Sequence, residues 1–347
     1  MGGYSRRALT SLYPIATISL MEFLHTGRHN DCPTPEDFEV GGAWEIRERL
    51  ISSDLGDTRP VYPPKVDTST KFIVGEGVPR YVVEENADLG TGGYATVHRG
   101  WDRRLGKYVA VKRLDRYWLD ESEIVPLFEL EAKSLSRTSH PGIPEVYDFT
   151  VIHDREGHAI PIIIMELVRG ECLSDRLLDY NKSLLPIDEV TRIINQTAST
   201  LDYIDRIGLH HGDIKSKNVL LAKPYLKLVD FGNSDWANPQ GPKGYTPGYA
   251  APELFGGKMD IKSDEYSLAA TAYEILFHTT PPENFQKNIK KIYLSHIKYK
   301  IDADTRERLL EIFQKGMATN PDERYESCTA FANAFCEVLI KQEDILD

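Results

Sequence analysis

Residues 211–218 read His-Gly-Asp-Ile-Lys-Ser-Lys-Asn and are followed directly by the apolar run Val-Leu-Leu at 219–221. The segment places a carboxylate, an ammonium group and an amide, from Asp213, Lys215 and Asn218, immediately before a predicted short strand. An oriented carboxylate can accept a proton from a reacting hydroxyl, and carboxylate and amide oxygens suit Mg²⁺. A lysine beside them can neutralise negative charge that develops on a reacting group. The pattern therefore predicts a reaction centre next to the strand.

A second carboxylate stands 17 residues after Asp213, in the sequence Asp230-Phe231-Gly232. The largely apolar run 226–229 precedes it, which predicts a strand that ends in a loop at Asp230. Each motif is weak alone, because an Asp-Gly pair often forms a simple turn. Together with Asn218, Asp230 is a candidate magnesium ligand.

A glycine-rich turn at residues 89–97, Leu-Gly-Thr-Gly-Gly-Tyr-Ala-Thr-Val, separates two predicted strands. Glycine has no Cβ, so the backbone N–H groups of such a turn can approach phosphate oxygens closely. The turn leads into a strand, whereas a dinucleotide-binding site needs the turn to open a helix. A purely structural hairpin is an equally good interpretation of these residues alone. The candidate cofactor-binding residues in this segment are Leu89, Gly90, Gly92, Gly93, Tyr94 and Val97.

Lys112 ends the predicted strand Val109-Ala110-Val111-Lys112, a place that a lysine usually avoids. Its stem could simply cross apolar surface while its ammonium group reaches water. Glu131 lies in a predicted helix at about 121–137 and can supply the carboxylate that fixes Lys112 against phosphate groups. The pair is therefore a second candidate for the reaction centre.

Strand and helix patterns divide the chain from residue 81 onward into two parts. Short β-branched and aromatic runs predict strands, and one helix interrupts them. From Ile187 onward, the apolar spacing i, i+3, i+4, i+7 predicts mostly helices. The sequence thus predicts an α+β fold in which an antiparallel sheet with one helix precedes a mainly helical region. The predicted strands lie near residues 81–83, 95–97, 108–111, 145–151 and 160–167.

Composition limits the partners and the location of the chain. Of its 347 residues, 41% are hydrophobic and 27% are charged, as in ordinary globular proteins. The formal net charge of −12 disfavours a nucleic-acid partner, which usually selects a basic surface. Four scattered cysteines without a Cys-x-x-Cys pair indicate free thiols in a reducing compartment. Pro14 and Glu22 interrupt the apolar stretch 8–24, so we expect no membrane span and a cytoplasmic location.

The order of the motifs along the chain is more specific than any one of them. Glycine-rich turn, strand lysine, helix glutamate, Asp-x-Lys-x-x-Asn, Asp-Phe-Gly and finally Ala251-Pro252-Glu253 follow one another as in the protein-kinase signature set. Over about residues 81–340 the chain resembles the Hanks-type, or eukaryotic-like, Ser/Thr protein kinase family. The resemblance implies a two-lobed fold, with an N-lobe at about 81–166 and a C-lobe at about 169–340. It also implies ATP and Mg²⁺ as cofactors and Ser/Thr hydroxyls of protein substrates, including the chain itself, as acceptors.

The resemblance also implies roles for individual residues. Asp213 would be the catalytic base, and Asn218 and Asp230 would bind Mg²⁺. Lys215 and Thr246 match the pattern of Ser/Thr kinases. Val97, Ala110 and Leu220 would sandwich the adenine. The hinge beside it would be formed by Glu166, Leu167 and Val168.

Two positions depart from the family pattern. Gly212 stands where most members carry an arginine that pairs with a phosphate on the activation segment, so we do not expect control through such a phosphate. Ala95 replaces a glycine that is common at the end of the glycine-rich loop, which stiffens the loop slightly. Two structural roles are retained: Glu253 would pair with Arg324, and Asp264 would hold the backbone of the catalytic loop.

Residues 1–80 are expected to form an extension and linker, with prolines at 60, 63 and 64. Two interpretations of this extension stay open, a regulatory contact with the kinase domain or a partner, and a docking or poorly ordered segment.

Three alternatives concern residues 81–340: a pseudokinase, a kinase for a small molecule and a tyrosine-specific kinase. The Ala-Pro-Glu element and Arg324 favour a protein substrate. A pseudokinase is disfavoured because the chain retains Lys112, Glu131, Asp213, Asn218 and Asp230.

Overall fold

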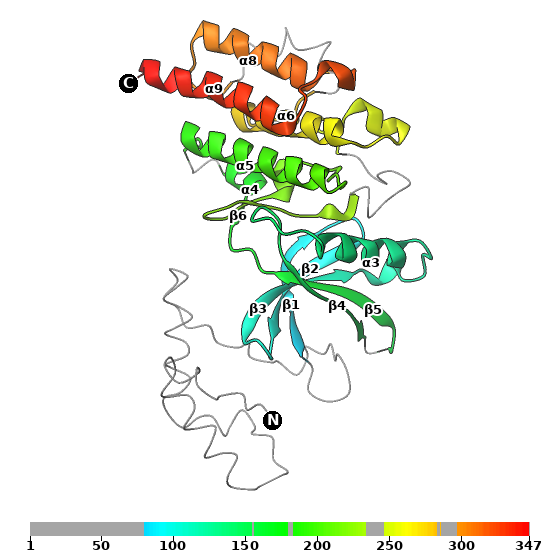
Figure 1. Ribbon diagram of the computed structural model, residues 1–347. Helices are drawn as coiled ribbons and strands as arrows, with labels where there is room; N and C mark the ends of the chain where they lie inside the picture. Colours follow the sequence, from blue (N-terminus) through cyan, green and yellow to red (C-terminus); the bar gives the residue numbers. More distant parts are fainter. Residues whose placement is uncertain are drawn as a thin grey trace, which may run out of the picture. The chain divides into compact units, whose positions relative to one another are not determined.

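The computed structural model describes residues 80–346, apart from residues 155, 180–182, 234–245, 283–284 and 286–296. The predicted α+β arrangement is confirmed, since a strand-rich lobe precedes a helical lobe along this part of the chain (Figure 1). The predicted extension at 1–80 lies outside the described residues, except for Arg80. Across the residues that the structure describes, no helix combines the length and the apolar character that a membrane crossing requires.

A five-stranded antiparallel sheet forms the N-lobe, with the strand order β1-β2-β3-β5-β4. β3 lies between β2 and β5, where Ala110 pairs with Arg99 on one side and with Met165 on the other. This central position explains the apolar sequence before Lys112, because both faces of the strand are covered. The strands are β1 Tyr81–Thr91, β2 Ala95–Asp102, β3 Lys107–Leu114, β4 Val146–His153 and β5 Ala159–Glu166.

Helix α3, Ile124–Leu135, packs against one face of this sheet (Figure 1). Phe128 and Ala132 on α3 are buried together with Leu114 of β3 and Ile163 of β5. Glu131 follows Phe128 by three residues, so it shares the buried side of the helix. The amphipathic pattern of α3 therefore points a carboxylate toward β3.

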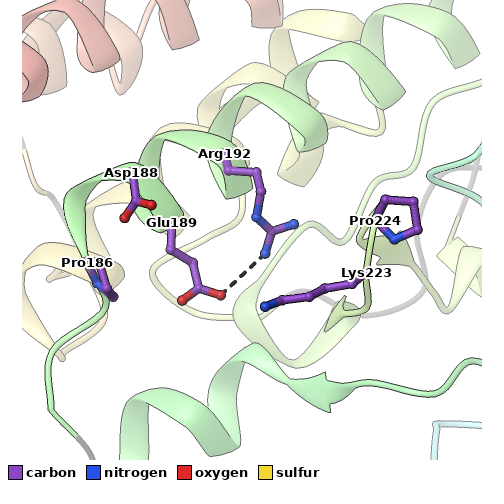
Figure 2. Close-up of a pocket in the computed structure, with 6 residues that line it drawn as sticks. All are labelled: Pro186, Asp188, Glu189, Arg192, Lys223 and Pro224. Atoms are coloured by element: carbon purple, nitrogen blue, oxygen red, sulfur yellow. Dashed lines mark hydrogen bonds and ion pairs between the residues drawn. The ribbon is translucent and has the colours of Figure 1, made fainter. Parts of the chain in front are cut away.

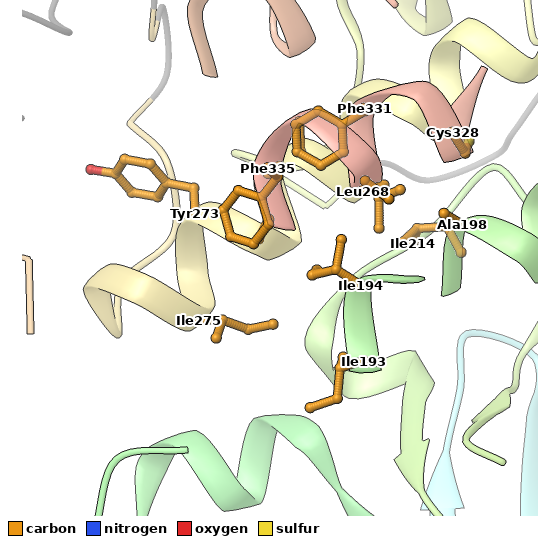
Figure 3. Packing of buried hydrophobic residues seen from close by; sticks show 14 of the residues in the cluster. Ile193, Ile194, Ala198, Ile214, Leu268, Tyr273, Ile275, Cys328, Phe331 and Phe335 are labelled. Carbon is orange, nitrogen blue, oxygen red and sulfur yellow. The ribbon is translucent and has the colours of Figure 1, made fainter. Parts of the chain in front are cut away.

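The C-lobe is built around α5 and α6, with α9 against them (Figure 3). Ile193 and Ile194 of α5 and Phe331 and Phe335 of α9 belong to one buried cluster. Ile214, between Asp213 and Lys215, is fully buried in the same cluster, so the core itself anchors the predicted reaction centre. The helices are α4 Leu173–Leu178, α5 Ile187–Arg206, α6 Ile261–Phe277, α8 Ala303–Gly316 and α9 Cys328–Leu346.

A small second sheet, with the order β6-β7-β8, lies between α5 and the N-lobe sheet (Figure 1). Its strands are β6 Glu171–Cys172, β7 Val219–Leu221 and β8 Lys227–Leu228. β7 follows directly after Asn218, and β8 ends two residues before Asp230. The antiparallel pairing of β7 with β8 therefore brings the two sequence motifs to one side of the C-lobe.

Glu265 is a buried acid in α6 that has no hydrogen-bond partner. Its side chain is 1% exposed, and neither carboxylate oxygen is hydrogen-bonded within the described part of the chain. Burial raises the pKa of Glu265 to about 8, although Arg324, Lys262 and Lys315 oppose this shift. The carboxyl is therefore mostly protonated at neutral pH and weakens the fold.

We predict that Glu265→Leu raises the melting temperature, with a larger gain at about pH 8 than at about pH 5. Between the ordinary pKa of 4.5 and the raised value of about 8, the unfolded chain ionises this carboxyl and the folded protein does not. Stability is consequently lost as the pH rises through this window, by at most about 5 kcal/mol. Thermal unfolding at several pH values measures the difference.

Glu265→Gln is the matched variant, because it removes the titration but keeps unpaired polar atoms in the core. It should flatten the pH dependence and gain less stability than Glu265→Leu. An equal gain for Glu265→Leu at both pH values would show that Glu265 titrates normally.

Candidate active site

Lys112 connects the two lobes. Its Nζ atom lies 2.6 and 2.9 Å from the two carboxylate oxygens of Glu131 and 3.3 Å from Oδ1 of Asp230. Lys112 is 8% exposed and Glu131 is 4% exposed. Burial works against the charge on Lys112, but the two carboxylates outweigh burial and raise the pKa of this ammonium group. Lys112 therefore stays charged in a nearly dry position.

Asp264 on α6 holds the backbone of the segment that contains Asp213. The N–H groups of His211 and Gly212 donate to its two carboxylate oxygens at 2.7 and 2.8 Å. Gly212 has a φ of 77°, a left-handed conformation that glycine adopts without strain. The His211 ring packs against Phe231 at 4.4 Å between ring centroids. These contacts fix the main chain on which the reactive side chains stand.

Asp213 lies at the centre of a compact polar group. Lys215 Nζ is 2.6 Å from Oδ2 of Asp213 and 2.9 Å from the hydroxyl oxygen of Thr246. The Thr246 hydroxyl in turn donates to Oδ1 of Asp213 at 2.9 Å. Asn218 Nδ2 donates to the Asp213 carbonyl oxygen at 2.8 Å. The structure thus brings Asp213, Lys215, Asn218 and Thr246 together.

Asp230 lies where the glycine-rich turn approaches the C-lobe. A Cβ atom on Gly92 would lie 3.8 Å from Oδ2 of Asp230, whereas one on Gly90 or Gly93 would meet nothing within 4 Å. Burial opposes the ionisation of Asp230, but the nearby charge of Lys112 outweighs it and lowers the pKa of this carboxyl. The backbone of the turn therefore faces an ionised carboxylate.

Two residues of the predicted nucleotide site direct their side chains elsewhere. The Tyr94 ring packs edge-on against Trp118, with 5.3 Å between ring centroids. The Glu166 carboxylate forms an ion pair with Lys227 at 2.7 Å. In this arrangement the side chains of Tyr94 and Glu166 each have a protein partner.

The other predicted nucleotide-site residues occupy the two neighbouring sheets and their ends. Leu89 is 51% exposed on β1, and Ala110 is buried on β3. Val97 on β2, Leu220 on β7 and Val168 after β5 are partly buried.

The structure also shows polar contacts around residues 211–218 that the sequence did not single out. The Ser216 hydroxyl donates to Oε1 of Glu274 on α6 at 2.9 Å. No local pattern indicates this contact, because the two residues are 58 positions apart. The expected pair of Glu253 and Arg324 forms at 2.7 and 2.8 Å and ties the Ala-Pro-Glu segment to the C-lobe.

A surface pocket of 610 Å³ lies elsewhere on the C-lobe, at the start of α5 (Figure 2). Glu189 and Arg192 form an ion pair on one side, and Lys223 lies opposite. None of the predicted site residues lines this pocket, and its charges of both signs select no ligand. We therefore base the candidate active site on the polar groups described above.

We predict that Lys112→Met lowers the free energy of unfolding by about 3–5 kcal/mol, because it leaves Glu131 buried without its cation. The double variant Lys112→Met/Glu131→Leu should recover most of this loss, since no uncompensated charge remains. Chemical denaturation measures both. Lys133→Met on the exposed side of α3 is the control and should change stability little. A double variant as unstable as Lys112→Met would contradict the pairing argument.

Comparison with known proteins agrees with this geometry. The chain is 32% identical over 267 residues to the serine/threonine-protein kinase PknF of Mycobacterium tuberculosis, covering 71% of this chain and 54% of PknF. It is 32% identical over 257 residues to a probable serine/threonine-protein kinase of Streptomyces coelicolor, covering 69% of this chain and 37% of that protein. The chain thus spans about half the length, or less, of these curated relatives.

The crystal structure of the kinase domain of Mycobacterium tuberculosis PknI superposes with a TM-score of 0.57 at 28% identity. This match covers 76% of the present chain and 99% of that one. The family model for the protein kinase domain matches residues 83–336. The chain therefore belongs to the protein kinase domain family.

Proposed function

We propose that the chain is a protein kinase that transfers the γ-phosphate of ATP, with Mg²⁺, to Ser or Thr hydroxyls of protein substrates. The observation that carries the proposal is the position of Lys112 between Glu131 and Asp230. Phosphoryl transfer in this family requires an ion pair between a strand lysine and a helix glutamate, and the Asp-Phe-Gly carboxylate in place for Mg²⁺. Lys112 and Glu131 form that pair, and Asp230 lies beside it. We further propose residues 81–340 as the catalytic domain.

The donor set fits a magnesium nucleotide. Asp230 is ionised beside the glycine-rich turn. Asn218 uses its Nδ2 group within the loop, which leaves its side-chain oxygen Oδ1 as an acceptor. Two protein oxygens suffice for Mg²⁺, which usually keeps water and phosphate oxygens as its other ligands. When bound, Mg²⁺ supplies electrostatic stabilisation of the charge on the phosphate oxygens.

The protein side of the reaction follows from the polar group around Asp213. The Asp213 carboxylate is oriented by Lys215 and Thr246 and can accept the proton of the attacking hydroxyl. Lys215 lies where it can balance negative charge on the group being transferred. Lys112 can hold nonreacting phosphate oxygens, and the backbone of the glycine-rich turn with Gly90, Gly92 and Gly93 can cover them. The Gly92 N–H donates to the Ala95 carbonyl oxygen at 2.9 Å and would have to change partner to reach a phosphate.

The hydroxyl acceptor class is supported by the contact between Lys215 and Thr246. Thr246 binds both Lys215 and Asp213, which links the segment after residue 245 to the catalytic loop in the way that the Ser/Thr pattern implies. The similarity to serine/threonine-protein kinase PknF and to the probable serine/threonine-protein kinase of Streptomyces coelicolor supports the same class. A small-molecule kinase and a tyrosine kinase are the alternatives that a substrate assay separates.

We predict that purified protein with Mg²⁺ and γ-labelled ATP places phosphate on Ser or Thr residues, of itself or of a generic protein substrate. Asp213→Asn should lower the rate by about 100-fold or more, because the oriented base is lost. Mass spectrometry maps the modified residues. Asp304→Asn on α8 is the control and should retain the wild-type rate.

Two arms of this assay address control of the activity. Since Gly212 replaces the usual arginine, phosphatase treatment should leave the rate within about twofold of the untreated protein. A variant without residues 1–79 tests the role of the extension. Its removal should change the kinetics if the extension is regulatory, and should leave them unchanged if the extension does not act on the domain. Transfer that is unaffected in Asp213→Asn, or phosphate found only on tyrosine, would contradict the proposed function.

A further inference from the structure

A second polar network lies directly behind the reactive side chains of the catalytic loop. Ser216 begins the short helix η3, Ser216–Asn218, and lies between Lys215 and Asn218 in the sequence. Ser216 is 2% exposed, and its hydroxyl donates to Oε1 of Glu274 at 2.9 Å. Glu274 lies 10 residues after Asp264 on the same helix, α6. Helix α6 thus contacts the catalytic loop through a second carboxylate.

Tyr249 joins this pair to the segment that binds Asp213. Its side chain is buried and interacts with both Glu274 and Ser216. The Tyr249 carbonyl oxygen accepts from the Ser267 hydroxyl on α6 at 2.9 Å, and its N–H donates to the Thr246 carbonyl oxygen at 3.1 Å. The segment 246–249 therefore touches the Asp213 carboxylate at one end and the Ser216–Glu274 pair at the other.

The main chain at Ser216 also contacts β6. The Cys172 thiol at the end of β6 lies 3.7 Å from the Ser216 carbonyl oxygen and 3.5 Å from that of Lys217. Sulfur is a weak donor, so these contacts contribute little energy by themselves. They show that the backbone of Ser216 lies next to β6 while its side chain contacts α6.

The hydrogen bond from Ser216 to Glu274 satisfies a buried carboxyl group. Burial raises the pKa of Glu274, and its contacts with Tyr249, Ser216 and Lys217 oppose this shift. Loss of the Ser216 hydroxyl would leave this buried acceptor with one hydrogen-bond partner fewer, which is unfavourable. Removing the Ser216 hydroxyl would therefore favour a rearrangement of the loop around Glu274.

We propose that Ser216 and Glu274 are positioning residues, whose hydrogen bond fixes Lys215 and Asn218 relative to Asp213. This inference rests on the proposed function. Ser216 acts through its two neighbours in the sequence, because its own hydroxyl points to α6 and not toward the Asp213 carboxylate. A displacement of reactive groups by about 1 Å can lower turnover by about 100-fold, so a modest loosening of the loop has a measurable effect.

A purely structural role makes a different prediction, and Thr271 provides the matched control. Thr271 is 1% exposed on α6, one turn before Glu274, and its hydroxyl donates to the Ser267 carbonyl oxygen at 2.9 Å. Thr271→Val removes a buried hydroxyl at constant volume without touching the catalytic loop. If Ser216 only supports the fold, then Ser216→Ala and Thr271→Val should behave alike.

Steady-state kinetics on the full chain test the proposal. Ser216→Ala should lower kcat by about tenfold while the KM values for ATP and for peptide stay within about twofold. Glu274→Leu, which removes the acceptor, should also lower kcat, and Ser216→Ala/Glu274→Leu should be no worse than the more impaired single variant, because both changes remove the same hydrogen bond. Thr271→Val should keep the wild-type kcat. Additive losses, an unchanged kcat or a change confined to the KM for peptide would each overturn the proposal.

Hydrogen exchange of the backbone separates this inference from the proposed function. In Ser216→Ala, amides in residues 211–218 should exchange faster than in wild type and in Thr271→Val, while exchange in α6 stays the same. If Ser216→Ala does not fold, Ser216→Cys is measured instead, because its slightly larger side chain carries only a weak donor. If the wild type transfers no phosphate, the proposed function fails and exchange alone decides the positioning role. Equal exchange in all variants would refute it.

Discussion

The ion pair between Lys112 and Glu131 is the interaction on which the rest of the site depends. A lysine that is almost completely removed from water is tolerated only when carboxylates compensate its charge. Glu131 supplies one from α3, and Asp230 supplies the other from the segment after β8. The packing of α3 on the sheet and the contact between the two lobes therefore both depend on a charged Lys112 in this position.

Helix α6 plays the corresponding part within the C-lobe. It is buried on almost all sides, so its surroundings are rigid and its polar residues have defined partners. Asp264 accepts hydrogen bonds from the N–H groups of His211 and Gly212. The Ser267 hydroxyl donates to the Tyr249 carbonyl oxygen, and Glu274 accepts from the Ser216 hydroxyl. The same helix thus positions residues 211–218 and the segment that carries Thr246. Glu265 is the exception, because its buried carboxyl has no hydrogen-bond partner among the residues that the structure describes.

The order of strands and helices could be predicted from the sequence because it depends on periodicity. The helix expected at about 121–137 spans Ile124–Leu135, and the strand expected at 145–151 spans Val146–His153. The motifs also indicated which residues meet near Asp213, because fixed spacings such as Asp-x-Lys-x-x-Asn encode local geometry. The sequence did not indicate the Ser216–Glu274 contact, the packing of Tyr94 on Trp118 or the ion pair of Glu166 with Lys227. Each of these depends on tertiary packing between distant segments, which periodicity and short motifs do not contain.

Calorimetric binding of a non-hydrolysable ATP analogue to wild type and to Asp230→Asn, with Mg²⁺ and with EDTA, tests the central claim most directly. The claim is that the groups gathered around Lys112 form a site for a magnesium nucleotide. We expect Mg²⁺ to tighten binding to wild type by about tenfold or more, and Asp230→Asn to lose this gain while its affinity in EDTA stays within about twofold. An unchanged effect of Mg²⁺ in Asp230→Asn, or a wild type that binds no nucleotide, would contradict the account.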